Sequence, residues 1–253
     1  MNAHDRFDAN VRNLTNLWSA MGATPMGDAL HASQSWPDRL WLGVDVQPER
    51  SDVMRWIQAD RGDARSMVLP VWCRSELGRA QPANMIEGLD LEEQLHSAGY
   101  SVSFEQTVMS MDLANWRADA AANNGVELVR VVDEAAGWAE VASRSFGYTV
   151  DPGVAEALVE APGVGMLMAR KAGAWVGTGL AFATGDSIGL HMVGVLPEAR
   201  RKGIARKIMV AMLNEARTQG FAQGMLQASD MGEGLYRQLG FSAFGRIKNY
   251  RRA

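Results

Sequence analysis

A cluster of positive charge lies in a chain whose formal net charge is −4. Five basic residues fall within eight positions of the segment 193–209, VGVLPEARRKGIARKIM, and they are Arg200, Arg201, Lys202, Arg206 and Lys207. The apolar spacing that starts at Ile204 predicts a helix beginning just after Gly203. Because the first amides of a helix are unpaired and its dipole is positive at that end, the segment predicts an anion-binding site.

The loop before this expected helix has little side-chain bulk at two positions. Gly203 and Ala205 leave room for a phosphate group to approach the backbone, and the basic side chains add charge. A pyrophosphate therefore fits the pattern Arg-x-x-Gly-x-Ala. The same hexamer also occurs by chance at the solvated start of an ordinary helix, so it does not establish a function alone.

A second segment follows at 220–241, GFAQGMLQASDMGEGLYRQLGF. Its pattern predicts a strand over 224–228, then a loop, then a helix that carries Leu235, Tyr236 and Leu239. Gly240 is expected to end that helix, just before Phe241.

Together, VLPEARRKGIA and LYRQLGF resemble two signature segments of the GNAT superfamily of acyl-CoA-dependent N-acetyltransferases, in the family's order and at a similar separation. The resemblance covers residues 126–252. It implies the GNAT fold, an α/β (α+β) arrangement in which a mixed, mostly antiparallel, twisted sheet is flanked by helices. It also implies an acyltransferase that moves an acetyl or other acyl group from acetyl-CoA to a primary amine, by direct attack in a ternary complex. Acetyl-CoA, leaving as coenzyme A, is the implied co-substrate.

The resemblance also assigns residues to the coenzyme. The strand before the basic loop would separate from its neighbour and offer its backbone to the pantetheine arm, and the loop would surround the pyrophosphate through its amides. Arg201 and Ala205 stand where many members have glycine, and Ser229 stands where many have an asparagine that touches the cofactor. The implied coenzyme-binding residues are Val193, Gly194, Val195, Arg200, Arg201, Lys202, Gly203, Ile204, Ala205, Arg206, Ser229 and Tyr236.

Two residues are candidates for the chemistry of transfer, which needs a neutral amine, a stabilised oxyanion and a proton for the leaving thiolate. Tyr236 matches the family tyrosine that often points at the coenzyme sulfur, and the alternative is a half-buried tyrosine with its hydroxyl in water. His191 precedes Val195 by four residues and is expected on the same strand face by the period of two. An unperturbed histidine has a pKa of about 6.5, which suits a general base. A structural histidine, with an ordered water chain as base, is the alternative.

Two other functions are compatible with parts of the sequence. A GNAT-like module could bind acyl-CoA without transferring the acyl group and act as a sensor or scaffold; Tyr236 favours the enzyme. The basic loop could instead bind nucleic acid. The negative net charge and the lack of aromatic residues among the basic ones argue against this.

The N-terminal part is expected to form a separate α/β half over 1–114, joined by a linker at 115–125 to the GNAT domain at 126–253. Asn123-Asn124-Gly125 is the turn signal that marks the boundary. A weak internal repeat aligns Gly99-Tyr100-Ser101 with Gly240-Phe241-Ser242 and places Leu95 opposite Tyr236. The first half is thus interpreted as a degenerate or partial GNAT-like copy that does not bind coenzyme.

Composition limits the remaining possibilities. Cys73 is the only cysteine, which excludes an intrachain disulfide and a cysteine-rich zinc site, and we expect it to be a buried small residue and expect no metal. No stretch approaches the roughly 20 apolar residues of a membrane span, so a cytoplasmic protein without membrane or nucleic-acid partners is expected. The expected partner is a small-molecule or peptide amine acceptor, and the expected state is a monomer or homodimer. Trp36, Trp41 and Trp56 are predicted core residues, with an aromatic substrate pocket as the alternative.

Overall fold

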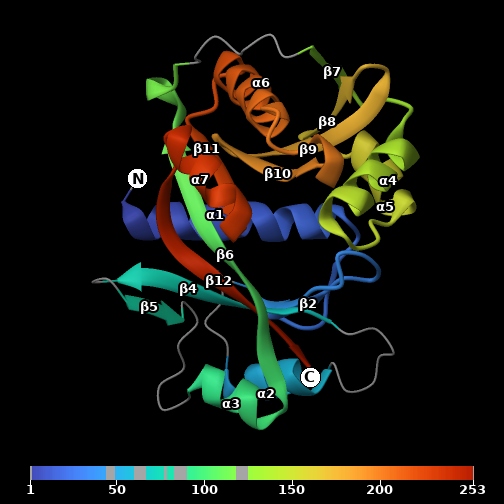
Figure 1. Ribbon diagram of the computed structural model, residues 1–253. Helices are drawn as coiled ribbons and strands as arrows, with labels where there is room; N and C mark the ends of the chain where they lie inside the picture. The colour runs from blue at the N-terminus through green and yellow to red at the C-terminus, as the bar shows by residue number, and fades with distance from the viewer. Residues whose placement is uncertain are drawn as a thin grey trace. The chain divides into compact units, whose positions relative to one another are not determined.

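The computed structural model describes residues 2–43, 49–59, 67–76, 79–82, 90–117 and 125–252. The chain forms two compact units (Figure 1). Unit 1 contains Met1–Met109 together with Gln227–Ala253, and unit 2 contains Ser110–Leu226.

Unit 1 combines helices with two sheets. Its strands follow the orders β1-β2-β3 and β5-β4-β12-β6, and the pairs β1–β2, β2–β3, β4–β5 and β4–β12 are antiparallel. In chain order its elements are α1 (Ala3–Ala20), β1 (Thr24–Pro25), β2 (Leu30–Ala32), β3 (Leu40–Leu42), α2 (Arg50–Ala59), β4 (Leu69–Glu76), β5 (Arg79–Pro82), α3 (Leu91–Ser97), β6 (Tyr100–Asp112), α7 (Asp230–Gln238) and β12 (Ser242–Arg252). The last residues of β6 belong to unit 2.

The first helix shows how local sequence sets an element's start. Asn2 accepts a hydrogen bond from the Asp5 amide at 2.9 Å, and the Asp5 carboxylate accepts one from the Asn2 amide at 3.3 Å. This reciprocal cap satisfies amides that have no partner within the helix. The apolar face of α1 then buries Phe7, Val11 and Leu17.

The tryptophans of unit 1 are core residues, as the sequence predicts. Trp41 and Trp56 are each 1% exposed and Trp36 is 9% exposed. The indole of Trp56 donates to the Leu40 carbonyl at 2.8 Å, so its one polar atom is satisfied inside the core. Cys73 is also buried, and burial raises the pKa of its thiol to about 12, which leaves little reactive thiolate.

Unit 2 is built on five neighbouring strands in the order β11-β10-β9-β8-β7. The pairs are antiparallel except β10–β11, which is parallel. Its elements are η1 (Leu113–Asn115), β7 (Val126–Arg130), α4 (Ala135–Phe146), α5 (Pro152–Glu160), β8 (Val164–Lys171), β9 (Ala174–Thr184), β10 (Ser187–Val195), η2 (Pro197–Ala199), α6 (Ile204–Thr218) and β11 (Gln223–Ala228), whose end continues into unit 1.

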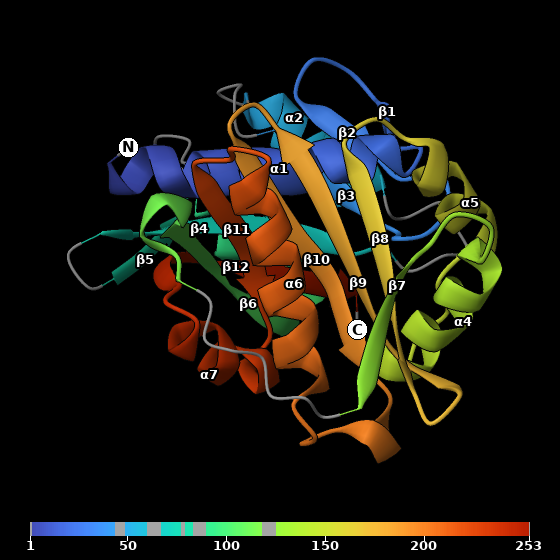
Figure 2. The ribbon, with the colours of Figure 1, turned by 90° about the horizontal axis from the view of Figure 1, so that it is seen from above.

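Helices α6 and α4 pack on opposite faces of β9 and β10, and Figure 2 shows α6 lying along these strands. Glycines make this close approach possible. A Cβ added at Gly179 would lie 2.7 Å from Cγ2 of Ile208 in α6, and one added at Gly194 would lie 2.8 Å from Cβ of Ser145 in α4. Gly179 therefore faces α6, and Gly194 faces α4.

The two compact units do not coincide with the predicted division at 115–125. Residues 118–124 of that linker lie outside the described residues. Strand β12 belongs to unit 1 because its residues Gly245–Tyr250 pair with Arg74–Leu69 of β4. The C-terminal strand of the predicted domain 126–253 thus packs with elements from the start of the chain.

Among the described residues, no helix combines the length and the apolar character that crossing a membrane requires.

Because β12 pairs with β4, the last strand of the chain needs the first half in order to be paired and covered. We expect a fragment of residues 125–253 to aggregate, because removing β4 exposes the edge of β12 and the buried side chains of Ile247 and Tyr250. Burial of a side chain like that of Ile247 contributes roughly 1.5–3 kcal/mol. Size-exclusion chromatography and hydrogen exchange over 242–252, with the full chain as control, measure this. A monomeric fragment with protected β12 amides would contradict the dependence.

Candidate functional site

The strand β10 separates from its parallel neighbour within unit 2. The β10–β11 ladder joins Ser187, Ile188 and Gly189 to residues 223–225, whereas β10 continues to Val195. The backbone of β10 beyond Gly189 therefore lies outside that ladder. This separation was expected from the family resemblance, and it affects the segment that contains Val193, Gly194 and Val195.

A β-bulge lies in the same part of β10. His191 pairs with Leu180 and Gly194 with Thr178, so Met192 and Val193 together oppose the single residue Gly179. Met192 has a φ of +49°, in the left-handed region that residues with side chains seldom adopt. The extra residue accounts for the register shift between β10 and β9.

The bulge corrects one prediction about His191. His191 pairs with Leu180, which lies on the α4 side with Thr178, whereas Val195 pairs with Gly177, which lies on the α6 side with Gly179. The two residues therefore occupy opposite faces of β10. The expectation of a shared face was wrong because one inserted residue reverses the alternation of side chains. His191 itself is buried, with 8% of its surface exposed.

The basic loop leads directly into the first turn of α6. Arg201 has a φ of +60° and Gly203 a φ of +75°, and Gly203 is the N-cap residue of α6. No side chain caps this end of the helix, so the amides of Ile204 and Ala205 in the first turn lack a side-chain acceptor. Gly203 is exposed and Ile204 is buried beneath it. An open helix N-terminus preceded by glycine is chemically suited to the pyrophosphate of a coenzyme.

The basic side chains of the loop have different environments. Arg200 is half-buried, and it donates to the Val195 carbonyl at 3.2 Å and to the Ser145 carbonyl at 2.9 Å. It therefore ties the end of β10 to the end of α4, which the sequence did not predict. Lys202 is exposed and donates to the Glu198 carbonyl at 2.9 Å. Arg201 is exposed and Arg206 is half-buried in the first turn of α6.

The two remaining predicted residues lie in unit 1, one just before α7 and one on it. Ser229 is the N-cap residue of α7, and it is exposed and makes no side-chain cap. Tyr236 is half-buried, packs edge-on against Phe241, and covers Gly232, where an added Cβ would lie 2.9 Å from the Tyr236 ring. Desolvation raises the pKa of the Tyr236 hydroxyl to about 12. The phenol is therefore protonated at neutral pH and in the form that can donate a proton.

Glu233 on the same helix was not singled out by the sequence. Its Oε2 accepts a hydrogen bond from the Thr107 hydroxyl at 2.7 Å, and its Oε1 accepts from Arg237 at 2.8 and 2.6 Å. The hydrogen bond from Thr107, followed by that from Arg237, lowers the pKa of Glu233. Glu233 stays ionised and fastens α7 to β6, so it is a poor proton acceptor.

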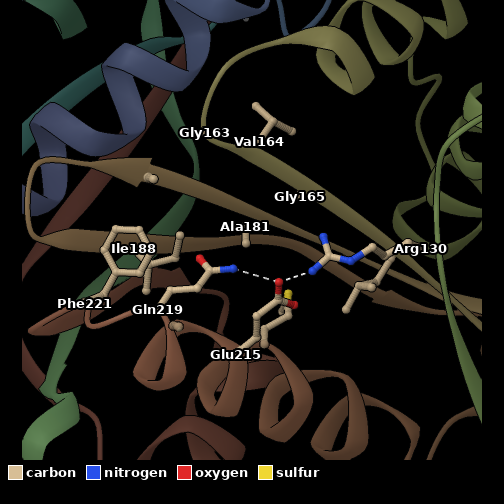
Figure 3. Close-up of a pocket in the computed structure, with 13 residues that line it drawn as sticks. Arg130, Gly163, Val164, Gly165, Ala181, Ile188, Glu215, Gln219 and Phe221 are labelled. Carbon is tan, nitrogen blue, oxygen red and sulfur yellow. Dashed lines mark hydrogen bonds and ion pairs between the residues drawn. The ribbon is translucent and has the colours of Figure 1, made fainter.

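A cavity of about 260 Å³ lies between the sheet of unit 2 and the last turns of α6 (Figure 3). Small residues of β8 and β9 form its floor, including Gly165 and Ala181. At its rim Glu215 accepts hydrogen bonds from Arg130 and from Gln219, the latter at 2.9 Å. Since α6 has 15 residues and rises about 1.5 Å per residue, this cavity is separated from the basic loop by most of the helix.

The sequence was compared with models of protein families. The model described as "Acetyltransferase (GNAT) domain" matches residues 128–251, which include the β10 bulge, the basic loop and α7. Among curated protein sequences, none is similar enough to this chain to count as a relative.

Solved structures resemble the chain over nearly its whole length. A GCN5-related N-acetyltransferase from Kribbella flavida has a TM-score of 0.66 at 17% identity, covering 96% of this chain and 95% of that one. A GCN5-related N-acetyltransferase from Sphaerobacter thermophilus has a TM-score of 0.62 at 16% identity, covering 99% and 93%. A tandem GNAT protein from the clavulanic acid biosynthesis pathway has a TM-score of 0.58 at 15% identity, covering 88% and 78%.

These similarities confirm the predicted fold class, a mixed and mostly antiparallel sheet flanked by helices, and extend it to the first half of the chain. The solved structures support the fold alone, and the family model supports the assignment to a family. The chain therefore contains, at residues 128–251, an acetyltransferase domain of the GNAT family.

Proposed function

We propose that the protein is an N-acetyltransferase that moves the acetyl group of acetyl-CoA to a primary amine by direct attack in a ternary complex. The observation that carries this proposal is the uncapped N-terminus of α6 behind the left-handed Gly203, placed after a bulged strand that has left its parallel neighbour. Such a helix end binds phosphate through amides and dipole without needing a dedicated cationic side chain.

Different residues of unit 2 bind different parts of acetyl-CoA. The amides of Gly203, Ile204 and Ala205 bind the pyrophosphate, and the exposed Arg201 and Lys202 add positive charge around it. The backbone of β10 beyond its ladder with β11 binds the pantetheine amides at Val193 and Val195. Arg200 supports this arrangement indirectly, because its guanidinium joins the carbonyls of Val195 and Ser145.

The transfer step forms one bond, breaks another and moves two protons. The neutral amine attacks the thioester carbon, an N–C bond forms, and the C–S bond breaks as the tetrahedral intermediate collapses. Tyr236 donates its phenolic proton to the departing thiolate, and its raised pKa keeps that proton in place at neutral pH. His191 accepts the proton that the amine loses, either directly or through water. The acceptor is a small molecule or a peptide that carries a primary amine.

The binding of coenzyme depends on the backbone at Gly203. We expect Gly203→Glu to weaken acetyl-CoA binding about 100-fold, because the carboxylate stands where the pyrophosphate approaches. Gly173→Glu is the matched control, since Gly173 also has a positive φ, of +83°, and has open space around it in a hairpin turn. Calorimetry should give about one acetyl-CoA per chain for the wild type and for the control. Equal affinities in the two variants would refute the assignment of the pyrophosphate site.

The proton donor is tested by removing one oxygen atom. Tyr236→Phe should keep the affinity for acetyl-CoA and lower kcat by roughly 10²-fold, the effect of losing a positioned proton donor. Because the pKa of Tyr236 is raised to about 12, wild-type activity should show no alkaline loss from this phenol near pH 10. A variant that turns over at the wild-type rate would leave Tyr236 with a packing role only.

The general base is tested through the pH profile. His191→Gln should flatten the acid limb of the kcat/KM profile, because the wild-type limb reflects protonation of the base as pH falls. Coenzyme affinity serves as the control and should stay at the wild-type value. An unchanged acid limb in the variant would show that His191 is not the general base, and that role would then belong to an ordered water.

A further inference from the structure

Thr178 makes an unusual contact inside the sheet of unit 2. It lies on β9, its side chain is 0% exposed, and its hydroxyl donates a 2.9 Å hydrogen bond to the carbonyl of Met192. Met192 is a bulge residue of the neighbouring strand. A side-chain hydroxyl of β9 therefore binds a backbone carbonyl at the point where regular pairing with β10 is interrupted.

The bulge is restricted by packing on both faces. Gly179, the residue opposite the bulge, has no room for a Cβ because Ile208 of α6 would lie 2.7 Å away. Gly194, the next paired residue, has no room because Ser145 of α4 would lie 2.8 Å away. These contacts fix where the strand runs. They do not orient the carbonyl of Met192. Because Met192 has a left-handed φ, the peptide that follows it does not take the regular direction of an extended strand.

The hydroxyl of Thr178 supplies that orientation. A partly buried carbonyl without a donor is unfavourable, so the Met192 peptide is most stable in the orientation in which its carbonyl accepts from Thr178. The direction of the backbone at the next two residues, Val193 and Gly194, depends on the orientation of this peptide. A Cβ at Gly194 would also lie 3.1 Å from the Thr178 hydroxyl oxygen, so Thr178 lies against both ends of the bulge.

We propose that Thr178 is a positioning residue for coenzyme binding, which sets the direction in which β10 presents its backbone to the pantetheine arm. The inference rests on the proposed function, because it assumes that acetyl-CoA lies along this strand. Thr178 contacts no reacting atom and acts through the Met192 carbonyl. Its hydroxyl is therefore needed for the pantetheine part of the ligand and is not needed for the pyrophosphate, which binds at α6.

Two ligands and two substitutions separate this role from a general structural one. Thr178→Val keeps the volume and removes the donor, whereas Thr178→Ser keeps the donor and removes a methyl group. Coenzyme A carries the pantetheine arm, and adenosine 3′-phosphate 5′-diphosphate keeps the pyrophosphate but lacks that arm. Calorimetry on the full chain measures both ligands with the wild type and each variant.

We expect Thr178→Val to weaken coenzyme A binding about tenfold, the effect of about 1.4 kcal/mol, and to leave the affinity for adenosine 3′-phosphate 5′-diphosphate unchanged. Thr178→Ser should bind both ligands like the wild type. KM for acetyl-CoA should rise in the valine variant more than kcat falls. If the valine variant does not fold, Thr178→Ser is compared with Thr178→Ala, since both lack the methyl group and differ by the hydroxyl.

Two results would overturn the proposal. Wild-type affinity for coenzyme A in the variants without a hydroxyl would show that the Met192 carbonyl does not need its donor. An equal loss for both ligands would show that Thr178 only supports the fold of the unit. A wild-type protein that binds neither ligand would instead refute the proposed function itself, so the two failures are distinguishable.

Discussion

One additional residue in β10 sets the arrangement of the candidate site. Because Met192 and Val193 oppose the single residue Gly179, the strand loses its regular alternation with β9. The same segment runs beyond the short ladder with β11 and ends at η2 and the basic loop. The position of this inserted residue determines which backbone is available for pantetheine and which face His191 occupies. It also determines how the chain leads into α6.

The bulge is stable because its neighbours leave few alternatives. Glycines at 177, 179 and 194 let α6 and α4 approach the backbone of β9 and β10 from opposite sides. The hydroxyl of Thr178 donates to the Met192 carbonyl, where the pairing of β10 with β9 is irregular. Arg200 then holds the carbonyls that follow, at the ends of β10 and α4. Packing fixes the path of the strand, and polar contacts fix the orientation of its peptides.

Local signals in the sequence were sufficient for the basic loop and for the elements that follow it. Gly203 and the apolar spacing after it predicted the start of α6 at Ile204, and the strand predicted at 224–228 lies within β11. The helix expected to carry Tyr236 is α7, and Gly240, with a φ of +95°, follows its end. The short helix α5 was not anticipated, although Asp151 caps it by accepting from the amides of Gly153 and Val154.

The features that the sequence missed depend on contacts between distant residues. An inserted bulge residue cannot be recognised from alternation alone, so His191 was assigned to the wrong face. The pairing of β12 with β4 joins residues about 175 positions apart, and no local pattern encodes it. Arg200 was interpreted as a charge for phosphate, and only the structure shows its guanidinium between two carbonyls. These omissions share one cause, which is that tertiary partners determine the role of a side chain whose type alone allows several.

The proposed activity of this chain is transfer of an acyl group from acetyl-CoA to an amine. The most direct measurement is release of free coenzyme A thiol from acetyl-CoA in the presence of grouped primary amines, namely amino acids, polyamines, aminoglycosides, lysine peptides and peptides with free N-termini, with mass spectrometry of the products. We expect thiol release that requires one of these groups of amines and matches the acetylated amine in a one-to-one ratio. Tight binding of acetyl-CoA without amine-dependent thiol release in any group would contradict it, and would leave a module that binds acyl-CoA without transferring the acyl group.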